Sequence, residues 1–250
     1  MAVTASPLLV PARFNGPPGS ANGGYVAGLL AARRDVDGPA TVTLREPPPL
    51  EVAMVVLTEG GTTTATFGGA VIATAERGEQ ASDPVAPVPF DAAAEAEGRY
   101  AGLAAHPFPT CYVCGPERPA GDGMGLRPGP VVEDADGRVA TTWVPGADQG
   151  DPDGTVTTPF VWAALDCPGG WSSDIVARPM VLGRMTAAVH ARPEVGDRCV
   201  VVGRVLSVEG RKTFTATTAY DEDGRVLGTA EATWIALREA PPTGRAPGSA

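Results

Sequence analysis

Basic side chains are scarce in this sequence. Its 250 residues contain 19 lysines and arginines, of which Lys212 is the only lysine, against 29 acidic residues, and the net charge is -10. Proteins that bind nucleic acid need a basic surface, because they must neutralise phosphate groups. The composition therefore argues against a nucleic-acid partner.

Long apolar segments are also missing. A helix that spans a membrane needs roughly 20 consecutive apolar residues, and no segment here reaches that length. Residues 1–7 have neither the basic start nor the apolar stretch of a secretory signal. We therefore expect a cytoplasmic protein without a membrane partner. Apolar residues make up 43% of the chain, which is enough to form a sizeable core.

Cysteine and histidine are few. The chain contains His106, His190, Cys111, Cys114, Cys167 and Cys199. A structural zinc site uses four ligands, and the pair Cys111-x-x-Cys114 has no second pair of the same spacing. We therefore predict free thiols in a turn, no metal and no cofactor. No histidine lies close to Cys167 in the sequence, which argues against a nucleophilic role for its thiol.

Two similar segments lie about 135 residues apart. They read NGGYVAGLLA over residues 22–31 and TTPFVWAALD over residues 157–166. Each is a polar triplet followed by a helical apolar pattern. The first offers backbone donors at Gly23 and Gly24 and ends on alanine, whereas the second has Pro159, which lacks an N–H, and ends on Asp166. A single functional site assembled from two duplicated halves would show this division.

The elements around the two segments also repeat in order. After the first helix we predict strands at 41–44, 51–58 and 62–75, and after the second helix at 182–191, 197–209, 212–221 and 226–237. A further strand is expected at 138–144 and a short helix within 91–103. These patterns divide the chain into a first unit (1–90), a linker (91–107), a second unit (108–240) and a disordered tail (241–250).

Glycine and proline predict local features within these units. Residues 1–13 are expected to form an extended lead-in, and the strand at 62–75 is expected to bulge at Gly68-Gly69. Pro159 suits the first turn of the second helix. Pro168 is expected to end or kink the same helix, because proline cannot donate the backbone hydrogen bond.

A helix wrapped by a curved antiparallel sheet, present twice, resembles the double-hotdog acyl-CoA thioesterases. The run CYVCGP at residues 111–116, followed by Gly125-Leu126, resembles the opening of hotdog thioesterases of the phenylacetate-pathway type. In that family an aspartate follows the last glycine of a His-Gly-Gly triplet by seven residues, and Asp166 follows Pro159 by the same spacing. The resemblance covers residues 14–90 and 108–238. It implies an α+β tandem hotdog with two antiparallel sheets, each wrapping a central helix.

The resemblance also implies a site and a reaction. In these families a backbone N–H at one helix N-terminus binds the thioester carbonyl, and the carboxylate comes from the partner's helix. Gly24, or less readily Gly23, would therefore be the oxyanion donor, Asn22 would orient carbonyl or water, and Asp166 would act as base or nucleophile. The substrate would be acyl-CoA or a related thioester. The mirror-related combination around Pro159 should be inactive.

Four aromatic residues are candidates for the wall of the substrate pocket. They are Tyr25, Phe160, Trp162 and Trp171.

The oligomeric state is expected to be a monomer or a homodimer.

Departures from the family pattern leave alternatives open. The family histidine is replaced by Asn22 and Thr157. The Thr and Gln of the long-chain enzymes fall near Gly183 and near Ala232 or Thr233. These losses favour, as an alternative, a non-catalytic protein that binds an acyl or other apolar small molecule. A hydratase of the same fold needs an Asp–His pair, and no histidine follows the only similar run, Gly150-Asp151.

Overall fold

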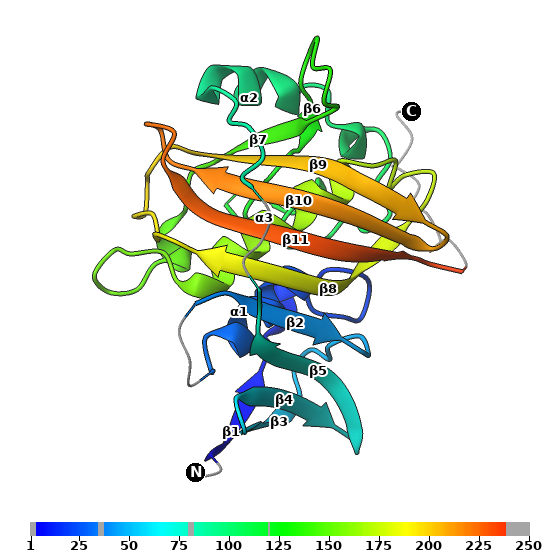
Figure 1. Cartoon of the computed structure of the whole chain (residues 1–250), viewed down its shortest axis with the longest axis vertical. Helices are drawn as coiled ribbons and strands as arrows, with labels where there is room; N and C mark the ends of the chain where they lie inside the picture. The colour runs from blue at the N-terminus through cyan, green and yellow to red at the C-terminus, as the bar shows by residue number, and fades with distance from the viewer. Residues whose placement is uncertain (1–3, 35–37, 80–82, 120, 239–250) are drawn as a thin grey trace.

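One continuous antiparallel sheet runs through the computed structural model, which describes residues 4–34, 38–79, 83–119 and 121–238 (Figure 1). The predicted tail at 241–250 lies outside the described residues. The strand order is β1-β3-β4-β5-β2-β8-β11-β10-β9-β7-β6. The strands are β1 (Thr4–Leu9), β2 (Ala40–Leu44), β3 (Ala53–Glu59), β4 (Thr62–Phe67), β5 (Ala70–Arg77), β6 (Gly129–Pro130), β7 (Val139–Trp143), β8 (Met180–Val189), β9 (Cys199–Glu209), β10 (Lys212–Tyr220) and β11 (Val226–Ala236).

The two antiparallel sheets expected from the resemblance are joined into one by the pairing of β2 with β8. Ala40 faces Ala187 and Thr43 faces Arg184 across this junction, and the hydroxyls of Thr41 and Thr186 lie 2.8 Å apart. Each strand would otherwise leave a row of unpaired backbone groups at a sheet edge. The pairing joins the strands of the first half to those of the second.

Two helices fill the concave side of this sheet. They are α1 (Gly23–Ala31) and α3 (Thr158–Trp171), and they pack against each other (Figure 1). They run antiparallel, because Gly24 lies against Asp166 late in α3 whereas Gly28 lies against Pro159 at its start. A Cβ on Gly28 would approach the Pro159 Cα to 2.6 Å. Glycine at this position therefore permits the close crossing of the helices.

The predicted break at Pro168 is wrong, because α3 continues to Trp171. Every residue from Phe160 to Trp171 is buried under the sheet, and this packing outweighs the lost helical hydrogen bond. A Cβ on Gly203 of β9 would lie 2.6 Å from the Pro168 carbonyl oxygen, so glycine there makes room for the helix. The Thr217 hydroxyl donates to the Leu165 carbonyl at 2.7 Å and holds the same turn.

Two strand predictions also change. Gly68 and Gly69 form a turn with φ values of 57° and 83°, so they separate β4 from β5 instead of forming a bulge. The extended lead-in is a true strand, since β1 pairs with β3 and places Pro7 opposite Val55. The other predicted strands lie within a few residues of their expected bounds, whereas the two-residue strand β6 was not predicted.

The linker covers the outer face of the second half. It contains α2 (Phe90–Glu97) and the 3-10 turn η2 (Ala101–Leu103), and further 3-10 turns are η1 (Ala12–Phe14) and η3 (Ala147–Gln149). Val200 and Val202 of β9 face α2, whereas Val201 between them faces the main core with α3. Within the described residues, no helix has the length and apolar character needed to cross a bilayer.

Candidate functional site

Asn22 holds the start of α1 and faces the second helix at the same time. Its side-chain oxygen accepts a hydrogen bond from the Tyr25 backbone N–H at 2.9 Å, which is the N-cap arrangement. Its side-chain nitrogen donates to Oδ2 of Asp166 at 3.2 Å. Asn22 is 3% exposed. The cap therefore fixes the amide group so that its donor side points at the carboxylate.

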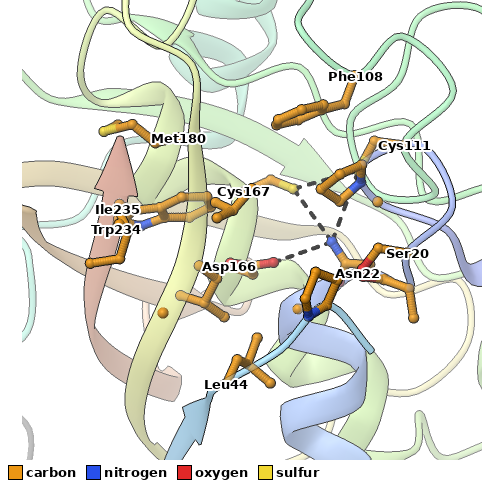
Figure 2. Close-up of a pocket in the computed structure, with 18 of the residues that line it drawn as sticks. Ser20, Asn22, Leu44, Phe108, Cys111, Asp166, Cys167, Met180, Trp234 and Ile235 are labelled. Atoms are coloured by element: carbon orange, nitrogen blue, oxygen red, sulfur yellow. Dashed lines mark hydrogen bonds between the residues drawn. The ribbon is translucent and has the colours of Figure 1, made fainter. Parts of the chain in front are cut away.

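Asp166 is the buried carboxylate of the site. It lies in α3 and is 2% exposed, and Figure 2 shows its carboxylate facing the Asn22 side chain. Its Oδ2 also accepts the Gly24 backbone N–H at 2.9 Å. Within the described part of the chain its other oxygen, Oδ1, has no hydrogen-bond partner. Burial raises the pKa of Asp166 to about 7, and the bonds from Gly24 and Asn22 act against this rise. A carboxylate so placed is matched to proton transfer near neutral pH.

The two glycines that open α1 occupy different positions. A Cβ on Gly24 would lie 2.4 Å from the Asp166 Cβ, so the close approach of the helices requires glycine there. Gly23 instead lines the cavity described below. Its N–H belongs to the first turn of α1, where backbone donors have no partner within the helix. Among the hydrogen bonds of the described residues, none uses the Gly23 N–H.

A cavity of about 590 Å³ reaches this pair of helix ends. Its wall is mainly apolar and comes from both halves of the chain (Figure 2). The lining residues include Ser20, Asn22, Gly23, Leu44, Phe108, Cys111, Asp166, Cys167, Trp171, Met180, Leu182, Trp234 and Ile235. Arg45 and Glu46 lie at its exposed rim. The cavity can therefore take an apolar group against the carboxylate and a polar group outside.

Three cysteines gather at one wall of this cavity. The sulfur atoms of Cys111 and Cys167 are 4.0 Å apart, and Asn22 Nδ2 lies 3.9 Å from each of them (Figure 2). Cys114 completes the group, and His106 Nε2 lies 3.5 Å from its sulfur. The sequence spacing revealed the pair in the turn but not Cys167, because that residue belongs to another element.

Of the four aromatic residues expected to line the pocket, only Trp171 lines this cavity. Tyr25 stacks on Phe14 with ring centroids 4.2 Å apart, and Phe160 lies 5.3 Å from Tyr25 in the same cluster. Trp162 packs against Gly28 between the helices. The helical rotation explains this placement: since Gly24 faces Asp166, the next residue, Tyr25, points about 100° away.

The mirror-related position around Pro159 is filled by helix packing. Pro159 lies against Gly28 of α1, and the described residues place no carboxylate of that helix beside it, since the position matching Asp166 is Ala31. The structure thus brings together Asn22, Gly24 and Asp166, and it places the rings of Tyr25 and Phe160 in a separate aromatic cluster with Phe14.

Comparison with known proteins gives the fold. No protein-family model and no curated protein sequence matches the chain. A candidate oleoyl thioesterase from Lactobacillus plantarum superposes with a TM-score of 0.61 at 11% identity, covering 96% of this chain and 97% of that one. A candidate thioesterase from Novosphingobium aromaticivorans gives 0.59 at 14% identity, covering 94% and 95%. A protein from Alicyclobacillus acidocaldarius described as having the hotdog fold gives 0.57 at 14% identity, covering 95% and 94%.

This chain has the hotdog fold. The three neighbours, one of which is described as a hotdog protein, match it along nearly its whole length. Two of the three carry the name thioesterase.

Proposed function

We propose that this hotdog protein hydrolyses acyl thioesters at the junction of α1 and α3. The observation that carries the proposal is the buried Asp166 carboxylate, bonded to the Gly24 N–H at 2.9 Å beside an apolar cavity of about 590 Å³. A tandem hotdog arrangement, in which each half contributes one helix to one site, accounts for this geometry. The names of two structural neighbours support the same reaction class.

The division of roles between the glycines follows from their hydrogen bonds. Gly24 N–H is already bound to Asp166, so it positions the carboxylate. Gly23 lines the cavity and lies at the positive end of the α1 dipole. We assign the Gly23 N–H as the donor to the thioester carbonyl oxygen. One donor of this kind typically stabilises the transition state by about 3 kcal/mol.

Asp166 then acts through its unbonded Oδ1. The carboxylate takes a proton from water while the water oxygen attacks the carbonyl carbon, and negative charge develops on the carbonyl oxygen. As the tetrahedral intermediate collapses, the C–S bond breaks and the thiolate leaves with the proton from Asp166. Direct attack by Asp166 would form an anhydride in place of this first step. Both routes need the same residue in the same place.

The substrate class follows from the cavity. An acyl chain fits the apolar wall formed by Met180, Trp171 and Trp234. Arg45 at the exposed rim suits the phosphates of coenzyme A. We therefore propose acyl-CoA as the substrate and the cytoplasm, where this thioester is made and used, as the location.

The hydrogen bond between Gly24 and Asp166 also favours a second candidate function. Because the Gly24 N–H is occupied by Asp166, and the family histidine is replaced by Asn22, the same cavity suits non-catalytic binding of an acyl group. In that case native mass spectrometry of the purified protein would retain the ligand, and no thioester would turn over.

The deciding experiment compares the wild-type protein with Asp166→Asn on acyl-CoA thioesters of several chain lengths. Free thiol is measured as it is released. The asparagine oxygen can still accept the Gly24 N–H, so the fold should be kept, and thermal melting checks this. We expect turnover by the wild type and a loss of about 10²- to 10⁴-fold in the variant. Equal turnover of the two proteins would remove Asp166 from the mechanism.

A further inference from the structure

Three sulfur atoms from two separate elements converge beside the cavity. Cys111 and Cys114 belong to one turn and Cys167 to α3, and their sulfurs all lie within 4.8 Å of one another. The sulfurs of Cys111 and Cys167 are 4.0 Å apart. Two thiolates on one tetrahedral zinc ion, each with a bond of about 2.3 Å, are about 3.8 Å apart. The spacing of Cys111 and Cys167 is close to that value.

Nitrogen donors face every one of the three sulfurs. Cys114 receives the Trp171 indole N–H at 3.4 Å and the His106 ring at 3.5 Å. Asn22 Nδ2 lies 3.9 Å from both Cys111 and Cys167. A neutral thiol is only a weak acceptor, whereas a thiolate is a strong one. The donors are therefore arranged as they would be around negatively charged sulfur.

His106 is a donor to this cluster and not a ligand. Its Nδ1 accepts the Phe108 backbone N–H at 2.8 Å, so the proton of the neutral ring lies on Nε2, which faces Cys114. No Lys or Arg of the described residues hydrogen-bonds to the three sulfurs. Buried thiolates without a positive charge would be very costly.

The turn that carries two of the sulfurs is held by backbone hydrogen bonds. Gly115 N–H donates to the Cys111 carbonyl at 2.9 Å, and Met124 and Leu126 bind the intervening carbonyls at 2.9 Å each. A Cβ on Gly115 would lie 2.5 Å from the Cys111 nitrogen, so this tight geometry needs glycine. The two cysteines are thus fixed in place before any ligand binds.

We propose that Cys111, Cys114 and Cys167 together bind one thiophilic cation of the Zn²⁺ class. Three thiolates supply the charge and softness that such ions prefer. The fourth position faces the cavity, where water or a thiol can occupy it. The ion would cross-link the turn to α3. It would also supply the positive charge that the neutral N–H donors around the sulfurs do not provide. Binding of the ion can be measured without a thioester, so this proposal does not rest on the proposed hydrolysis.

The test uses the full chain, reduced and freed of metal by a chelator, and then titrated with Zn²⁺ in competition with a chromophoric chelator. We expect one ion per chain and, with Co²⁺ in its place, intense sulfur-to-metal absorption. Cys167→Ser should weaken Zn²⁺ binding more than about 100-fold, which exceeds the usual effect of losing a residue that only hydrogen-bonds to a ligand. Trp171→Phe removes one N–H donor to Cys114 and should weaken it about 10-fold. Cys199→Ser is the matched control, because Cys199 is buried in β9 outside the cluster.

Three results would overturn the site. The first is a wild-type protein that is folded by circular dichroism and takes up no Zn²⁺. The second is an affinity that falls equally in Cys167→Ser and in the Cys199→Ser control. The third is a disulfide among the three cysteines of the wild-type protein. Its mass would then be two hydrogens lower before reduction than after it, and the reduced protein would bind no metal. The wild-type titration decides the question even if a variant fails to fold.

Discussion

The backbone N–H of Gly24 donates to the carboxylate of Asp166 across 142 positions of the chain. Hydrogen bonds to a charged acceptor are stronger than neutral ones, and this bond is buried. It ties the start of α1 to the later half of α3. The same contact therefore serves the packing of the two helices and the placement of the proposed catalytic carboxylate.

Gly24→Ala should damage both packing and activity. The added Cβ would lie 2.4 Å from the Asp166 Cβ and 2.9 Å from the Trp162 carbonyl oxygen, so the helices must separate. We expect a loss of about 1–3 kcal/mol in the free energy of unfolding, measured by denaturant titration. Thioester turnover per folded molecule should fall at least about 100-fold, because the carboxylate moves.

Gly28→Ala is the control for that variant. Its Cβ would lie 2.6 Å from the Pro159 Cα on the same helix face, but away from the carboxylate. It should lose comparable stability while its folded fraction keeps most of the turnover. Equal losses of activity in both variants would mean that the effect comes from helix packing alone.

Asn22→Ser should keep the helix-capping function of residue 22 and remove its hydrogen bond to Asp166. Serine caps a helix as well as asparagine does, so the Tyr25 N–H keeps an acceptor and stability should change by less than about 1 kcal/mol. The bond of Asn22 Nδ2 to Asp166 at 3.2 Å would be lost. We expect turnover to fall about 10-fold, as for the loss of one hydrogen bond to a charged group. A variant with full activity would show that Asn22 acts only as a cap.

Much of the fold could be predicted because its signals are local. Alternating apolar residues marked β3 and the long strands β9 to β11, and the Asn-Gly-Gly run marked the start of α1. Comparing the two similar segments indicated that each carries a different part of the site, and the resemblance to hotdog thioesterases implied that Gly23 or Gly24 would face Asp166. The comparison of residues 22–31 with residues 157–166 gave information that neither segment contains alone.

What the sequence did not reveal depends on three-dimensional packing. Pro168 sits inside α3, because Gly203 and Thr217 on the sheet accommodate the helix there. Cys167 joins Cys111 although no spacing rule connects a helix with a turn 56 residues earlier. The cavity wall at Met180 comes from β8 in the middle of the joined sheet. None of these contacts follows from the periodicity of one segment.

Pro159→Ala tests the asymmetry of the two halves. Pro159 is the second residue of α3 and corresponds to Gly24, and it lies against Gly28 with no carboxylate beside it among the described residues. We expect slightly reduced thermal stability, because the fixed proline φ suits the first helical turn. Thioester turnover should be unchanged. A large loss of turnover in a folded variant would indicate a second working site.

Met180→Phe should shift the preference for acyl chain length. Met180 is 1% exposed and lines the cavity, so a larger side chain there takes space from the ligand. Removing room for one methylene typically changes specificity by about 10-fold or more. The ratio of kcat/KM for long over short acyl-CoA should therefore fall, with the rate on the shortest substrate preserved. Val71→Phe adds a ring at a site that is 38% exposed and outside the cavity, and it should leave the ratio as in the wild type. If Met180→Phe slows all chain lengths equally, the acyl group does not extend toward β8, and the apolar wall near Phe108 and Trp171 becomes the remaining place for it.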